Sequence, residues 1–88
     1  MKWTRESIRS DLVKLLQQHT QDGANIAETS HLVGDLGIDS LGVMEILADV
    51  EDTFALSIPD DALKDVETVG DVAGAIETRL AADGRLDG

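Results

Sequence analysis

The sequence predicts an all-α fold: a four-helix bundle of three longer helices and one short helix, with a long first loop. Apolar residues recur three and four positions apart in three segments, which is typical of the buried face of an amphipathic helix. The alternation that marks half-buried strands is missing, and the 88 residues include one Phe, one Trp and no Tyr. We expect a single domain over residues 1–88, and the lack of Cys excludes disulfides and thiolate metal sites.

The first helix is expected over residues 4–19. Thr4 is suited to capping its N-terminus. The face that follows at helical spacing consists of Ile8, Leu12, Leu15, Leu16 and His19. Residues 20–38 then form a loop of a length that compact domains seldom contain unless the loop has a function.

The second helix is expected over residues 39–54, with Asp39 as its cap. Its core face consists of Ile46, Leu47, Val50 and Phe54. A second stripe on a neighbouring face mixes apolar and acidic residues: Leu41, Met44, Glu45, Ala48 and Asp52. This stripe either docks a partner protein or widens the arc of the helix that faces the core.

A short helix is expected over residues 59–65, because Pro59 is favoured in a first turn and the acids that follow it suit the positive end of a helix. The last helix is expected over residues 68–82, capped by Thr68 with Asp71 three residues later. Its core face consists of Val69, Val72, Ala73, Ile76 and Leu80. We interpret residues 83–88 as a frayed tail.

The formal charge of −11 is concentrated in one interval. No Lys or Arg stands between Lys14 and Lys64, and the acids there are Asp22, Glu28, Asp35, Asp39, Glu45, Asp49, Glu51, Asp52, Asp60 and Asp61. Such a field repels nucleic acid and anionic membranes and attracts proteins with basic patches. No apolar run approaches the roughly 20 residues of a membrane span, and no signal peptide is visible, so we expect a cytoplasmic monomer.

Catalytic and metal sites find little support. A serine nucleophile needs a neighbouring base, and the histidines are His19 on the helix face and His31 in the loop. A calcium loop that begins at Asp35 would need Gly at its sixth position and Glu at its twelfth, and neither is present. We therefore predict no enzyme and no metal, and keep a small hydrolase built on Ser40 as a weaker alternative.

Ser40 stands one residue inside a helix N-terminus. Free backbone N–H groups and the positive end of the helix dipole would stabilise a phosphodiester on its hydroxyl. The simpler interpretation of an Asp-Ser pair is that Asp39 and Ser40 share the capping of the helix. Local chemistry alone leaves both interpretations open.

Five motifs follow one another in a fixed order: Gly37-Ile38-Asp39-Ser40-Leu41, Met44-Glu45-Ile46, Glu51-Asp52-Thr53-Phe54, Ile58-Pro59-Asp60-Asp61 and Thr68-Val69-Gly70-Asp71-Val72. With these motifs, residues 32–80 resemble the acyl carrier protein family. The resemblance implies a four-helix fold with a short third helix. It also implies that Ser40 receives 4′-phosphopantetheine from coenzyme A, whose thiol then carries an acyl group as a thioester.

The resemblance further implies roles for residues around Ser40. The positions that meet partner enzymes are Asp39, Leu41, Met44, Glu45, Glu51 and Asp52. The positions near the arm or acyl chain are Ile58, Leu63 and Val66. The implied partners are a phosphopantetheinyl transferase, an acyltransferase or other acyl-loading enzyme, and a ketosynthase.

Two residues depart from the pattern of fatty-acid carriers, which often have acids there: Gly42 after Leu41, and Lys64 in the expected short helix. They favour a freestanding carrier of polyketide or peptide–polyketide hybrid biosynthesis. A carrier for fatty-acid synthesis, and an aminoacyl or peptidyl carrier, are alternatives with the same fold. An acidic helical adaptor without a prosthetic group is the alternative of another class.

Overall fold

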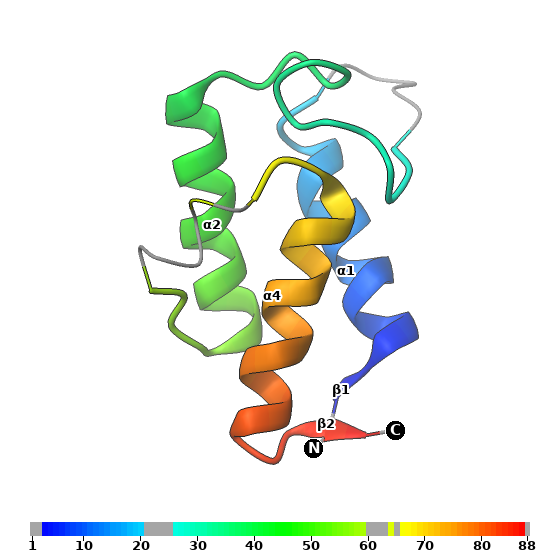
Figure 1. The fold of residues 1–88 in the computed structure, drawn as a ribbon, viewed down its shortest axis with the longest axis vertical. Coiled ribbons are helices and arrows are strands. Elements are labelled where there is room, and N and C mark those ends of the chain that lie inside the picture. The colour runs from blue at the N-terminus through cyan, green and yellow to red at the C-terminus, as the bar shows by residue number, and fades with distance from the viewer. Residues whose placement is uncertain (1–2, 21–25, 60–63, 65, 88) are drawn as a thin grey trace.

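Three helices lie side by side in the computed structural model of this chain, which describes residues 3–20, 26–59, 64 and 66–87 (Figure 1). Helix α1 (Arg5–Gln17) runs antiparallel to α2 (Ser40–Phe54) and α4 (Val69–Ala82) (Figure 1). The N-termini of α2 and α4 therefore lie at the same end of the bundle. The prediction of an all-α fold is confirmed. The short helix expected over residues 59–65 falls mainly on residues 60–63 and 65, which lie outside the described part.

Each helix begins at the cap that its sequence indicates. Thr4 and Ser7 form a reciprocal capping box at the start of α1, and Thr68 and Asp71 form one at the start of α4. Asp39 caps α2 through its side chain. These N-terminal boundaries follow from local chemistry, because the capping oxygen and the N–H groups that it satisfies are only three residues apart.

Helix α1 ends at Gln17, two residues before the predicted boundary. Its last turn tightens as the N–H groups of Gln18 and His19 donate to carbonyls three residues back. His19 is half-buried and not part of the core, and its Nε2 lies 3.0 Å from Oδ2 of Asp49 in α2. The spacing places His19 on the apolar face of α1, but its ring contacts Asp49 of another helix instead.

The core lies between the three helices. The faces predicted for α2 and α4, and the aliphatic residues predicted for α1, are all buried. The loop adds Leu32 and Ile38, which are 1% and 4% exposed, while Ile26 and Leu36 pack against the core from its edge. Within the described residues, no helix is long and apolar enough to cross a membrane.

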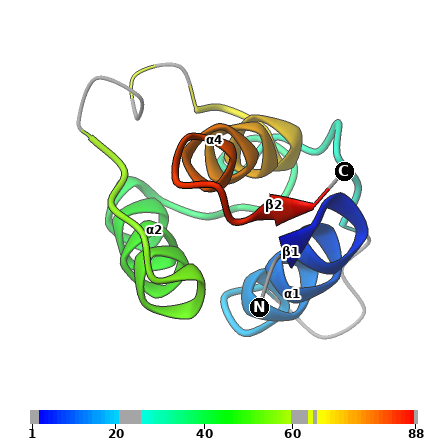
Figure 2. The same ribbon diagram turned by 90° about the horizontal axis from the view of Figure 1, so that it is seen from below.

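The prediction of a frayed tail is wrong for residues 83–87. Strand β1 (Trp3–Thr4) pairs in parallel with β2 (Leu86–Asp87), with Trp3 opposite Leu86 (Figure 2). The Trp3 N–H donates to the carbonyl of Arg85 at 2.7 Å. The Trp3 ring packs against Phe54 with centroids 4.6 Å apart. Contacts between the two ends of the chain order a segment whose local composition indicates no structure.

Candidate functional site

Ser40 is the first residue of α2, and it is exposed. The residue before it supplies the helix cap: Oδ1 of Asp39 accepts a hydrogen bond of 2.7 Å from the N–H of Gly42. The carbonyl of Asp39 accepts another, of 2.9 Å, from the N–H of Val43. Asp39 thus carries the capping function, and the hydroxyl-bearing residue beside it stands at the positive end of the helix, open to solvent.

The loop that leads to Ser40 is fastened to the start of α4. The N–H of Leu32 donates to the carbonyl of Glu67, and the N–H of Ile38 donates to the carbonyl of Leu32, both at 2.9 Å. Gly37 adopts φ of 69°, a left-handed conformation that glycine tolerates best. Buried Leu32 and Ile38 anchor the same segment from below. The chain therefore reaches Ser40 along a path fixed by both hydrogen bonds and burial.

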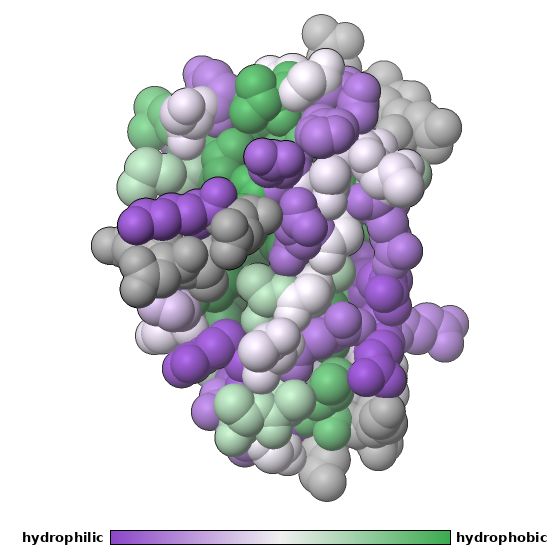
Figure 3. All heavy atoms as spheres, viewed as in Figure 1, coloured by the Kyte–Doolittle hydropathy of each residue, from purple (hydrophilic) through white to green (hydrophobic). Residues whose placement is uncertain are grey.

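The outward face of α2 combines exposed apolar side chains with acids. Leu41 and Met44 are 67% and 64% exposed, so neither widens the face that packs into the core. Glu45 and Asp52 are exposed on the same helix. Apolar atoms are visible on the surface over the start of α2 (Figure 3). Exposed apolar groups among like charges form a surface suited to a partner with an apolar pocket and a basic rim.

Glu51 differs from the other acids predicted to meet partners. It is half-buried, and its Oε2 accepts a hydrogen bond of 3.1 Å from the N–H of Ile58. The N–H of Leu56 also donates to its carbonyl, at 3.1 Å, where the chain reverses through Ala55 with φ of 52°. Glu51 therefore holds the segment that follows α2, in addition to any role on the surface.

Two cavities flank the residues predicted to pack against an arm or acyl chain. Ile58 is buried, Val66 is half-buried, and both line a cavity of about 420 Å³ beside α4. Val66 also lines a second cavity, of about 330 Å³, together with Val43 of α2 and Val33 of the loop. Leu63 lies outside the described residues. The structure thus places Ile58 and Val66 in the lining of one cavity.

Val33 is a residue that the sequence analysis missed. Its side chain is 62% exposed, although its neighbour Leu32 is buried. The sequence shows only an apolar residue beside a glycine in a loop, and this does not indicate whether its side chain points into the core or toward solvent. Only the structure shows that Val33 borders the cavity next to α2.

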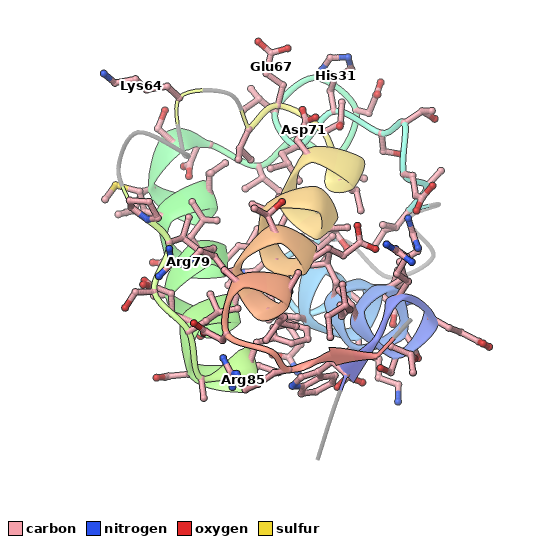
Figure 4. All side chains as sticks on the ribbon, turned by 60° about the horizontal axis from the view of Figure 1, so that its bottom comes forward. His31, Lys64, Glu67, Asp71, Arg79 and Arg85 are labelled. Atoms are coloured by element: carbon pink, nitrogen blue, oxygen red, sulfur yellow. The ribbon has the colours of Figure 1, made fainter. Side chains whose placement is uncertain are left out.

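His31 belongs to the start of α4 and not to Ser40. Its backbone forms a bridge with Thr68, and its N–H donates to Oδ2 of Asp35 at 2.7 Å. His31, Glu67 and Asp71 lie at the same end of the molecule (Figure 4). The N–H groups of Thr68 and Glu67, each 3.0 Å from Oδ2 of Asp71, hold the pKa of that carboxyl below its ordinary value. These contacts give the Ser–His hydrolase alternative no support.

Comparison with known families and sequences gives a consistent result. The family described as phosphopantetheine attachment site matches residues 8–76. An acyl carrier protein of Exiguobacterium sibiricum is 37% identical over 78 residues, which cover 88% of this chain and 99% of that protein. A meromycolate extension acyl carrier protein of Mycolicibacterium smegmatis is 35% identical over 78 residues, covering 88% of this chain and 79% of that protein.

Solved structures share the fold. A mitochondrial acyl carrier protein of Toxoplasma superimposes with a TM-score of 0.77 at 23% identity, covering 88% of this chain and 91% of that chain. A putative acyl carrier protein from Mycobacterium tuberculosis gives a TM-score of 0.66 at 30% identity, covering 84% of this chain and 95% of that chain. The arrangement of helices around the core is therefore one that carrier proteins use.

Proposed function

We propose that this chain, which belongs to the acyl carrier protein family, joins its prosthetic group through the hydroxyl of Ser40 and presents acyl groups to partner enzymes without catalysis of its own. The prosthetic group of the family is 4′-phosphopantetheine, derived from coenzyme A. The observation that carries the proposal is the exposed Ser40 at the start of α2, with Asp39 already engaged in the cap. We also propose that residues 59–65 form the short helix expected from the sequence.

The residues around Ser40 fit a phosphodiester. A phosphate needs an accessible oxygen to which it is bonded, donors near it, and no free anion directly against it. Ser40 is exposed, the N-terminus of α2 supplies the positive end of a dipole, and the N–H of Gly42 engages Oδ1 of Asp39. When bound, the group supplies a thiol that holds acyl chains as thioesters. Ser40 would hold the group, and Asp39 would keep the turn in place.

The partner-facing surface is proposed to be the outward face of α2. Exposed Leu41 and Met44 would enter apolar pockets, and Glu45 and Asp52 would pair with basic residues of the transferase, the acyl-loading enzyme and the ketosynthase. We assign Asp39 and Glu51 a smaller share, because their carboxylates already bind backbone N–H groups. Ile58, Val66 and Leu63 are proposed to pack against the arm or acyl chain.

We propose polyketide or peptide–polyketide hybrid biosynthesis as the pathway, and Gly42 and Lys64 are the residues that support it. Extension of fatty acyl chains is the second candidate, favoured by the similarity to a meromycolate extension carrier. The cargoes released from the protein of the native host by mild thioester cleavage, identified by mass spectrometry, would distinguish the two. An α-methylated or aminoacyl-primed cargo favours the first, and a long unbranched chain favours the second.

The attachment site is tested by intact mass. Incubation with coenzyme A and a phosphopantetheinyl transferase of broad specificity should add one phosphopantetheine to the wild-type protein and none to Ser40→Ala. Ser57→Ala is the matched control, because Ser57 is exposed in the segment after α2 and should not affect the reaction. A wild-type protein that gains no mass while the transferase modifies another carrier would refute the proposal. Unimpaired modification of Ser40→Ala would refute the assignment of the residue.

A further inference from the structure

Gly42 occupies a position where glycine is not expected. It is the third residue of α2, two residues after Ser40, and its backbone is helical with no positive φ. Glycine is among the poorest helix formers, so a residue chosen for helix formation alone would have a side chain here. The atoms around position 42 show what a side chain there would meet.

The space that a side chain would need is already filled by Ile38. A Cβ atom on residue 42 would lie 2.7 Å from Cγ2 of Ile38 and 3.2 Å from Oδ1 of Asp39. Carbon atoms in good contact lie roughly 3.5–4.0 Å apart, so the first distance is a severe overlap. The same Cβ would also crowd the Asp39 carboxylate, which caps the helix. Any residue larger than glycine would therefore act on both residues that precede Ser40.

Ile38 has no way to move aside. Cγ2 is attached directly to its Cβ, and β-branched side chains are restricted at χ1. The side chain is 4% exposed, so other rotamers meet the core. The backbone is held as well, since the N–H of Ile38 donates to the carbonyl of Leu32, whose own N–H donates to Glu67. The first turn of α2, whose Ser40 and Leu41 are exposed, is the part that would shift.

We propose that Gly42 and Ile38 form a complementary pair that sets the position of Ser40 for modification, with Gly42 acting as a positioning residue. The inference rests on the proposed attachment at Ser40. It predicts that the two positions are coupled: a larger residue at 42 is tolerated only when the branch at 38 is removed.

The test uses Gly42→Ala, Ile38→Leu and the double variant. Leucine branches at Cγ and not at Cβ. Ile38→Leu therefore removes the Cγ2 methyl that overlaps and keeps a similar side-chain volume. Gly74→Ala is the matched control, because a Cβ on Gly74 of α4 has no neighbour within 4 Å. All variants are compared as full-length, unmodified protein.

Amide correlation spectra report the position of Ser40 without any enzyme. In Gly42→Ala we expect the amide resonances of Asp39 and Ser40 to move, and in the double variant to return toward those of Ile38→Leu. Because both variants carry the same substitution at position 42, its direct effect on the spectrum cancels in this comparison. If the resonances move as far between Ile38→Leu and the double variant as they do between wild type and Gly42→Ala, the proposal is overturned.

Transferase kinetics supply the functional readout. We expect Gly42→Ala to lower kcat for modification by about 10-fold with little change in KM for the carrier, since displacement of a reacting group by about 1 Å can reduce rates roughly 100-fold. The double variant should recover most of the loss, and Gly74→Ala should match wild type. Wild-type kcat in Gly42→Ala would overturn the proposal. Failure of wild type to be modified would instead remove the attachment proposal, and the spectra would still decide whether Gly42 and Ile38 are coupled.

Discussion

Arg85 closes the end of the bundle opposite Ser40. Its guanidinium donates from Nη1 to the carbonyl of Phe54 at 3.0 Å and from Nη2 to the carbonyl of Ala55 at 2.8 Å (Figure 4). These carbonyls lie at the C-terminus of α2, where a positive charge also interacts favourably with the helix dipole. The carbonyl of Arg85 in turn accepts from the N–H of Trp3. One residue therefore joins α2 to both ends of the chain.

The structure sets the size of the effect expected for Arg85→Ala. A hydrogen bond with a charged partner contributes about 1.5–3 kcal/mol when it is well shielded. The side chain of Arg85 is 30% exposed, so we take about 1 kcal/mol for each of the two bonds, or about 2 kcal/mol in total. In a domain of this size about 1 kcal/mol shifts Tm by roughly 4–8 °C, so the expected loss is about 8–16 °C.

Urea unfolding followed by helical circular dichroism measures this loss. Lys14→Ala is the control for charge, because it also removes one cation from a chain of net charge −11 but from an exposed position on α1. Arg85→Lys keeps the charge without the planar fork, and we expect it to recover no more than about half of the stability. If Arg85→Ala unfolds within about 0.5 kcal/mol of Lys14→Ala, charge alone accounts for the effect and the two hydrogen bonds contribute little.

Two further predictions concern α4. Gly74→Ala should raise the free energy of unfolding by about 1 kcal/mol, because the new methyl meets no neighbour and alanine favours the helix. Gly70→Ala should gain less or lose, because its Cβ would lie 3.1 Å from the carbonyl of Glu28, and equal gains in urea unfolding would contradict this. Asp71→Asn preserves an acceptor but removes the charge. Because the pKa of Asp71 is lower in the folded protein, its charge stabilises the fold above about pH 4 and this contribution is lost as the pH falls. Wild type should therefore be more stable than Asp71→Asn near neutral pH, and this difference should shrink as the pH falls below about 4, whereas a gap independent of pH would count against the assignment.

The helix starts could be predicted from the sequence because their causes are local. Thr4, Asp39 and Thr68 each precede an apolar stripe and each bind an N–H three residues ahead. The position of the His19 ring depends on a distant residue instead. His19 fits the apolar spacing, but the nearness of Asp49 on another helix decides where its ring goes.

The tail was misjudged for the same reason. Asp83-Gly84-Arg85-Leu86-Asp87-Gly88 contains charges and glycines and no periodic apolar face. The order of residues 83–87 comes from Trp3 and from the end of α2, which are distant from them in the sequence. Nothing within six residues encodes a contact of that kind.

In the candidate site, too, some features follow from the local sequence and others depend on distant residues. The order of motifs indicated Ser40, and the cap geometry could be expected from Asp39 alone. Whether Leu41 and Met44 faced the core or the solvent depended on how α2 is rotated, which helical spacing left open and their exposure decides. The internal bond of Glu51 to Ile58 was hidden as well, because the chain must first turn back through Ala55.

The surroundings of Ser40 also bear on how a strongly acidic chain can hold another anion. The first turn of α2 contains no acidic residue, although acids are favoured at that end of a helix. Gly42 contributes to this, and the Asp39 carboxylate is hydrogen-bonded to the N–H of Gly42. A phosphodiester on Ser40 would thus meet a local potential less negative than the charge of −11 suggests, while the acids farther along α2 remain available to basic partners.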